Sequence, residues 1–196
     1  MFIRRIISLA VVISAVAATW FQLAYQKPRA LANYKQVPDF HLTERSGKTV
    51  SLSDLKGKVW VADFFYASCP GPCPMISNRL SGLQSEAFKS DDVRFVSVST
   101  LPDMDTPDVL KKYAEKFHAS ENQWLFLTGD KSQIYNLSNK GFMLTAVEQK
   151  DTDAPVIHST QLALVDKSGN IRGYYDGTDD AKTKQLLDDI KKLLHE

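Results

Sequence analysis

Apolar and polar residues alternate along this chain with two periods, one typical of strands and one typical of helices. Strand patterns occur at residues 40–42, 49–52, 59–65, 94–99, 124–128, 162–165 and 171–175. The first two stretches and the last two each flank a short polar turn that contains glycine. Each of these two pairs is therefore predicted to form a hairpin.

Helical spacing separates several of the strand patterns. Apolar residues recur with the helical period over residues 73–87 and again over 186–194. Shorter helices are predicted at 106–117, where Thr106 is a suitable N-cap, and at 132–137. This α/β order, closed by a hairpin and a helix, predicts a mixed sheet covered by helices on both faces. That is the thioredoxin layout with an N-terminal hairpin extension.

The N-terminal region has a different pattern. Residues 6–25 contain no charged side chain and follow two arginines. A helix of this length spans about 30 Å, the thickness of a bilayer's hydrocarbon core. We expect an uncleaved transmembrane helix, with a cleaved secretory signal as the alternative. The predicted organisation is an anchor or signal at 1–26, a polar tether at 27–36 and one exported domain at 37–196.

Charge is nearly balanced outside this region. Of the chain's 24 basic residues two lie in the predicted anchor, which leaves 22 basic and 23 acidic residues in the rest. No basic patch and no stripe of alternating basic and aromatic residues is visible. The sequence therefore gives no reason to expect a nucleic-acid partner.

Cys69 and Cys73 are the only cysteines among the 196 residues. They lie where the strand at 59–65 passes into the helix at 73–87, a position where free backbone N–H groups and the helix dipole stabilise thiolate. Four residues is about one helical turn, so both sulfurs are expected on one side. Such a pair can close a disulfide or hold one metal ion.

His158 is the histidine best placed to join them. It directly precedes the strand at 162–165, and in thioredoxin-like folds the loop that enters this strand packs against the cysteines. Thioredoxin-type reductases carry a cis-proline there, whereas residues 157–162 contain no proline and Pro155 lies three residues before His158. The other three histidines, His41, His118 and His195, are expected either at the surface or with their hydrogen bonds satisfied, without a role in the site.

Two thiolates and one imidazole form a soft ligand set that suits Cu(I) and, with an added oxygen or nitrogen donor, tolerates Cu(II). Zinc is the rival ion, but a structural zinc site needs four ligands. A plain structural disulfide between Cys69 and Cys73 is the third interpretation. A bridge that closes so short a loop stabilises little, because the gain grows with loop length.

The chain resembles the Sco/SenC family, membrane-anchored thioredoxin-fold proteins linked to copper delivery to cytochrome c oxidase. The resemblance covers about residues 37–194 and is most specific in the run Ser68-Cys-Pro-Gly-Pro-Cys-Pro-Met75. Further similar segments are Val37-Pro-Asp-Phe40, Gly57 to Phe65, Asp105 to Ala114, His158-Ser159, Leu164 to Gly169 and Ile171 to Gly177. The resemblance implies that Cys69, Cys73 and His158 are the copper ligands.

Two positions depart from the family pattern. Leu101 stands where members commonly have an aspartate near the metal, and Ile157 stands where many have an aspartate before the histidine. Loss of these charges predicts weaker binding, of Cu(II) above all, than in a typical member. The acidic residues that offer compensation are Asp103, Asp105, Glu148, Asp151 and Asp153.

Two functions follow from the resemblance. The first is a copper metallochaperone for the copper-bearing subunit of cytochrome c oxidase or another copper client, kept reduced by an upstream thiol reductase. The second is a thiol–disulfide reductase of specific exported clients, in which Cys69 attacks and Cys73 resolves. A peroxiredoxin-type peroxidase is disfavoured, because the threonine which those enzymes need before their cysteine is absent. The expected location is the bacterial inner membrane, with the domain facing the periplasm.

Overall fold

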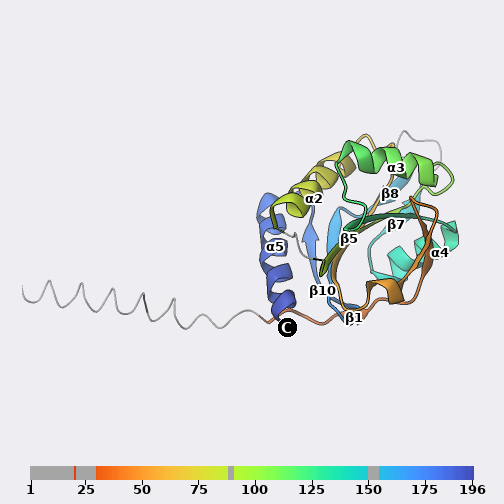
Figure 1. Cartoon of the computed structure of the whole chain (residues 1–196). Coiled ribbons are helices and arrows are strands. Elements are labelled where there is room, and N and C mark those ends of the chain that lie inside the picture. Colours follow the sequence, from red (N-terminus) through yellow and green to blue (C-terminus); the bar gives the residue numbers. More distant parts are fainter. Residues whose placement is uncertain (1–19, 21–29, 88–90, 150–154) are drawn as a thin grey trace, which may run out of the picture. The chain divides into compact units, whose positions relative to one another are not determined.

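The computed structural model describes residues 20, 30–87, 91–149 and 155–196 (Figure 1). The folded unit runs from Leu31 to Glu196. Its strands are β1 (Lys35–Gln36), β2 (His41–Glu44), β3 (Thr49–Ser51), β4 (Val59–Phe65), β5 (Val93–Ser99), β6 (Trp124–Thr128), β7 (Ala146–Glu148), β8 (Val156–His158), β9 (Gln161–Val165) and β10 (Asn170–Asp176). Its α-helices are α2 (Cys73–Ala87), α3 (Pro107–Lys116), α4 (Lys131–Asn136) and α5 (Asp180–His195), with a 3-10 turn at Leu52–Leu55 and a π-turn at Leu137–Gly141.

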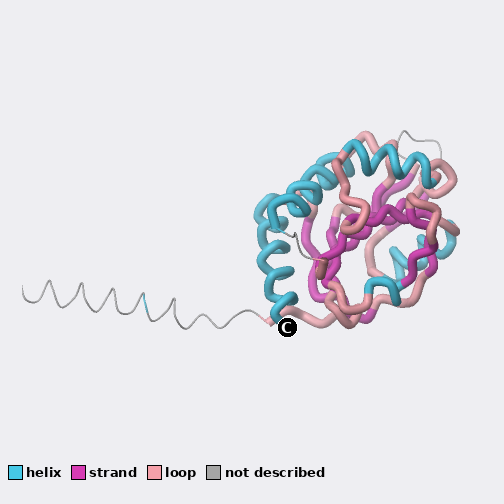
Figure 2. Tube along the Cα trace, viewed as in Figure 1, coloured by secondary structure: helices cyan, strands magenta, loops and turns pink. Residues whose placement is uncertain are grey.

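Eight strands form one mixed sheet in the order β1-β10-β9-β4-β5-β6-β2-β3. Figure 2 shows the strands in magenta, with helices in cyan packed beside them. The central strands β4, β5 and β6 are parallel, and the remaining pairs are antiparallel. Every side chain of β4 is buried, which explains its continuous apolar run, because a central strand is covered on both faces. β7 and β8 form a separate two-stranded sheet.

Two apolar clusters hold the layers together, one on each face of the sheet. The first joins residues of α2, α3 and α5 to alternate side chains of β4 and contains both cysteines. The second joins the α4 region to the other side chains of β4, with Trp60 and Phe64 in edge contact with Phe142. Helices therefore cover both faces of the sheet, as the sequence predicts.

The predicted elements are confirmed, with small shifts at their ends. β4 and β6 have the predicted bounds, both predicted hairpins form, and the Thr106 side chain accepts a hydrogen bond from the backbone N–H of Val109 as an N-cap does. Three short strands were not predicted: β1, β7 and β8.

The N-terminal boundary also differs from the prediction. Leu31 is buried in the first cluster and β1 pairs with β10, so the later part of the expected tether belongs to the folded unit. The predicted anchor at 1–26 lies, apart from Trp20, outside the described residues. Within the described part of the chain, no helix has the length and apolar character that a membrane crossing requires.

Candidate metal centre

The two cysteines lie on the segment that connects β4 to α2. The backbone N–H of Cys69 donates to the Tyr66 carbonyl at 3.2 Å, which bends the chain after the strand, and Cys73 is the first residue of α2. Cys69 is 8% exposed and Cys73 is 2% exposed. Both are free thiols, so the structure contains no disulfide between them.

His158 is brought to the cysteines by the hairpin of β7 and β8. It is the last residue of β8 and pairs with Ala146, and the next N–H, that of Ser159, donates to the Thr145 carbonyl at 2.9 Å. His158 Nδ1 donates to the Ser159 carbonyl at 3.1 Å, so in the neutral ring Nε2 keeps its lone pair. His158 Nε2 lies 3.1 Å from Cys73 Sγ.

Three potential ligand atoms therefore meet at one point. The sulfurs of Cys69 and Cys73 and a ring nitrogen of His158 all lie within 4.8 Å of one another. The hydrogen bond from Nδ1 to a carbonyl is the kind of support that orients an imidazole ligand towards a metal. The remaining histidines, His41, His118 and His195, are exposed at the surface, as predicted.

The two thiols differ in acidity. The pKa of Cys69 is lowered, chiefly by hydrogen bonding with the Cys73 side chain, against the opposing effect of burial. Hydrogen bonding with the His158 ring and with backbone N–H groups of Cys73 and Gly71 lowers it further. Hydrogen bonding with the Cys69 side chain, together with burial, raises the pKa of Cys73. Cys69 is therefore the more acidic thiol of the pair.

Asp105 holds the segment that leads to Cys69 in place by hydrogen bonds. Its carboxylate is buried, and Oδ2 accepts hydrogen bonds from the backbone N–H of Ala67 at 3.0 Å and from Ser99 Oγ at 2.6 Å. Ser99 Oγ in turn accepts from the backbone N–H of Leu101 at 3.1 Å. Burial raises the pKa of Asp105. Sequence reasoning named Asp105 only as a compensating acid, whereas its observed contacts are structural.

The two departures from the family pattern have different surroundings. Leu101 is 9% exposed and belongs to the apolar cluster that contains both cysteines. Ile157 is 49% exposed and pairs with Val147, which is 50% exposed, so it does not share the buried environment of Leu101.

Two of the acids proposed to compensate for these positions, Asp103 and Glu148, are paired with a lysine. Lys131 Nζ bonds Asp103 at 3.3 Å and Glu148 at 2.7 Å. Asp151 and Asp153 lie outside the described residues. None of the described acids joins the group formed by the cysteines and His158.

A second buried carboxylate, that of Asp63, lies in the middle of β4. Its Oδ1 accepts from Ser97 Oγ, which also accepts from Trp124 Nε1 at 2.8 Å. Burial raises the pKa of Asp63 to about 6, although the hydrogen bond from Ser97 opposes the shift. The negative charge of Asp63 also helps to raise the pKa of Cys73.

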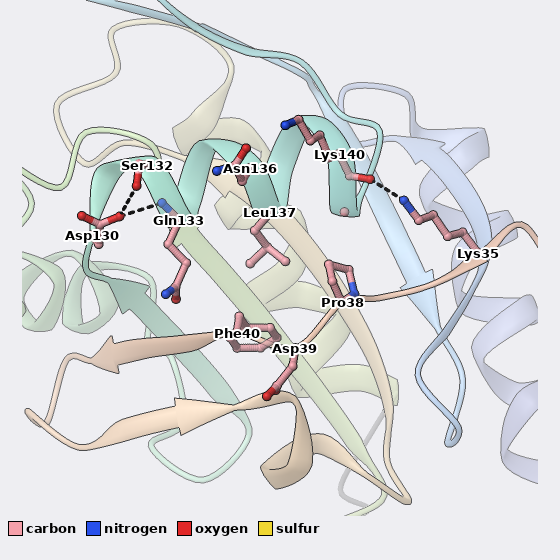
Figure 3. A pocket seen from close by; sticks show the side chains of 11 residues that line it. Lys35, Pro38, Asp39, Phe40, Asp130, Ser132, Gln133, Asn136, Leu137 and Lys140 are labelled. Atoms are coloured by element: carbon pink, nitrogen blue, oxygen red, sulfur yellow. Dashed lines mark hydrogen bonds between the residues drawn. The ribbon is translucent and has the colours of Figure 1, made fainter.

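A cavity of about 520 Å³ lies apart from these groups, between the segment before β2 and the α4 region (Figure 3). Phe40 and Leu137 provide apolar wall, and Lys35 Nζ bonds the Lys140 carbonyl at one edge at 2.7 Å. Its 11 lining residues include no cysteine and no histidine. The cavity therefore does not contribute to the group formed by Cys69, Cys73 and His158.

The fold and site define a class: a thioredoxin-like domain with a CysCysHis group at the end of its central strand. The SCO1/SenC family model matches residues 28–195. A SCO1 protein homologue of Bacillus subtilis is 34% identical over 161 residues, which are 81% of this chain and 82% of the relative. The chain belongs to the SCO1/SenC family.

Solved structures agree with this assignment. BsSco, described as a member of the Sco family of cytochrome c oxidase assembly proteins with a disulfide switch, is 33% identical with a TM-score of 0.73, covering 86% of this chain and 98% of its own. ScoI of Bradyrhizobium japonicum, solved with copper bound, is 27% identical with a TM-score of 0.63, covering 81% and 99%.

Proposed function

We propose that this protein binds one copper ion through Cys69, Cys73 and His158 and delivers it to the copper centre of cytochrome c oxidase. The observation that carries the proposal is that these three ligand atoms lie within 4.8 Å of one another. The copper-bound ScoI structure and the assembly role stated for BsSco support it through family membership.

The donor set fits copper in its reduced form. Two sulfurs and one imidazole nitrogen are soft ligands, and three of them suffice for Cu(I). Both cysteines bind as thiolates, and the opposite pKa shifts make Cys69 the thiol that loses its proton more readily and Cys73 the one whose proton copper must displace. The exposed residues Pro70 and Gly71 leave the cysteine segment open to a partner, which allows the ion to leave by ligand exchange.

The setting of this function is part of the proposal. The uncharged stretch at 6–25 supports attachment to the bacterial inner membrane with the domain in the periplasm. The thiols must be reduced before copper binds, so we infer an upstream thiol reductase as one partner. The copper-bearing oxidase subunit, or another copper client, is the second.

A thiol–disulfide reductase of specific clients is the second candidate. One observation favours it: Cys69, the more exposed cysteine, has the lowered pKa that an attacking thiol needs. Cys73, buried and protonated, then resolves the mixed disulfide. The disulfide switch described for BsSco is consistent with such chemistry.

Metal analysis of the full chain, purified without oxygen and loaded with Cu(I), separates the two candidates. About one copper per chain, lost in Cys69→Ser, Cys73→Ser and His158→Ala but kept in the surface control His41→Ala, supports copper binding. Failure of the wild type to hold copper, combined with reduction of an exported disulfide client that needs both cysteines, contradicts it and favours the reductase.

A further inference from the structure

The hairpin that carries His158 is a small sheet of its own. Its two strands, β7 and β8, pair with each other outside the eight-stranded sheet, and a lone two-stranded hairpin is marginally stable in water. Ala146 and Val156 are buried on its inner face, where the strand register also places Glu148 and His158. Apolar contact is non-directional, so this burial alone does not fix the direction in which the hairpin lies. Polar contacts must therefore hold the imidazole at the sulfurs.

Two such contacts come from α4 and the π-turn that follows it. Asn139 bonds the backbone of Ala146 at 2.8 and 3.0 Å, beside His158. Lys131 Nζ bonds Glu148 Oε1 at 2.7 Å, two residues further along β7. Two points of attachment on one strand fix its direction, whereas a single point leaves it free to pivot.

The same helix is bonded to the loop beside the cysteines. Tyr135 Oη donates to the Thr100 carbonyl at 3.2 Å. Lys131 Nζ also bonds Asp103, at the longer distance of 3.3 Å. Thr100 directly precedes Leu101, which lies in the apolar cluster that contains both cysteines. α4 therefore joins the half of the site that carries the imidazole to the half that carries the thiols.

We propose that Lys131 is a positioning residue of the copper site, whose ion pair with Glu148 sets the direction of the hairpin and so keeps His158 at the sulfurs. The inference rests on the proposed copper binding. The side chains of Lys131 and Glu148 are 34% and 49% exposed, so dissolved salt screens the pair. When the pair opens, one of the three ligands can leave the ion, as transfer by ligand exchange requires.

Hydrogen exchange in the metal-free full chain tests the attachment itself. The backbone N–H of Ala146 donates to the Asn139 side chain and is released when the hairpin moves away from that segment. We expect Lys131→Met to speed exchange of this amide about fivefold, the upper end for an exposed ion pair. Lys58→Met is the matched control, because Lys58 is similarly exposed and pairs with Asp92 at the end of β4 opposite the cysteines.

Charge reversal separates the ion pair from other effects of the substitutions. Lys131→Glu and Glu148→Lys alone are each expected to speed exchange of the Ala146 amide. The double variant keeps one lysine and two acids at this place, Asp103 included, and is expected to return the exchange close to the wild-type rate. In about 1 M salt the effect of Lys131→Met should shrink, because the Debye length is then about 3 Å. Additive effects in the double variant, an unchanged rate in Lys131→Met or an effect insensitive to salt overturns the proposal.

Copper measurements test the consequence for the site. In Lys131→Met we expect loss of Cu(I) to a chelator to be about fivefold faster, because the imidazole is more often away from the sulfurs, and the charge-reversed double variant to restore the rate. Unpaired acids alone would attract the ion and slow its loss, so slower or unchanged loss in Lys131→Met overturns the positioning role. A wild type whose hairpin responds in the exchange experiments but which binds no copper overturns the proposed function, and leaves the attachment of the hairpin.

Discussion

His158 Nε2 lies 3.1 Å from Cys73 Sγ, although 85 residues separate the two in the chain. The cysteine is held by the start of α2 and the histidine by the end of β8. Neither element controls the position of the other. The geometry of the site therefore depends on the side chains that hold each of the two segments in place.

Asn139 clamps the hairpin that carries His158. Its side chain bonds the backbone of Ala146 twice, at 2.8 and 3.0 Å, and Ala146 pairs with His158. We expect Asn139→Ala to weaken copper binding about tenfold, as loss of a group that orients a ligand does. Competition with a Cu(I) chelator measures the affinity. The matched control is Asn136→Ala on the preceding helical turn, and equal affinities for the two variants would contradict the clamp.

Asp105→Ala removes the acceptor shared by Ala67 and Ser99 and leaves buried donors without partners. Each such loss costs about 1–3 kcal/mol, so we expect unfolding in urea to become easier by at least that amount. The cysteine segment should also loosen, which faster alkylation of Cys73 in the folded protein would report. Asp103→Ala, at an exposed carboxylate two residues away, is expected to change neither property.

Leu101→Asp places a carboxylate in the apolar cluster that contains both cysteines. A negative charge near a bound cation is favourable, so we expect Cu(II) affinity to rise at least about tenfold, with a smaller gain for Cu(I). Burial of the new charge should make the metal-free protein less stable. Leu101→Asn is the control, because asparagine has nearly the same shape as aspartate but carries no charge. If titration followed by thiolate-to-copper absorption shows the same gain for Asn as for Asp, charge is not the cause.

Asp63 predicts a pH dependence of stability. Its folded pKa is about 6, above the ordinary 3.8, so the folded protein binds this proton more tightly than the unfolded chain does. The resulting stabilisation is complete below pH 3.8 and is lost as the pH rises through 6, with a total of about 3 kcal/mol.

Urea unfolding of the metal-free protein at several pH values measures this effect. Asp63→Asn keeps the acceptor for Ser97 Oγ and cannot ionise. The stability of the variant relative to the wild type should therefore increase by about 2 kcal/mol between pH 4 and pH 7. The surface variant Asp103→Asn serves as control. A constant difference between wild type and Asp63→Asn over this range would refute the assignment.

The regular elements were predictable because their causes are local. The continuous apolar run at 59–65 and the helical spacing after Cys73 are visible in the sequence, and β4 and α2 follow them. The unpredicted strands β1, β7 and β8 are short. They are strands because they pair with another segment, and their own pattern of apolar and polar residues does not identify them.

By itself the sequence determined that two thiols lie one helical turn apart at a strand-to-helix junction and that one histidine precedes the later strand. Tertiary structure decided the rest: that the imidazole meets the sulfurs and that the Asp105 carboxylate holds the cysteine segment by a hydrogen bond instead of joining the ligand group. The physical reason is that one turn of backbone fixes the spacing of the two thiols. The other contacts join segments that are distant in the chain, and their separation is set only by the packing of the sheet and by the pairing of β7 with β8.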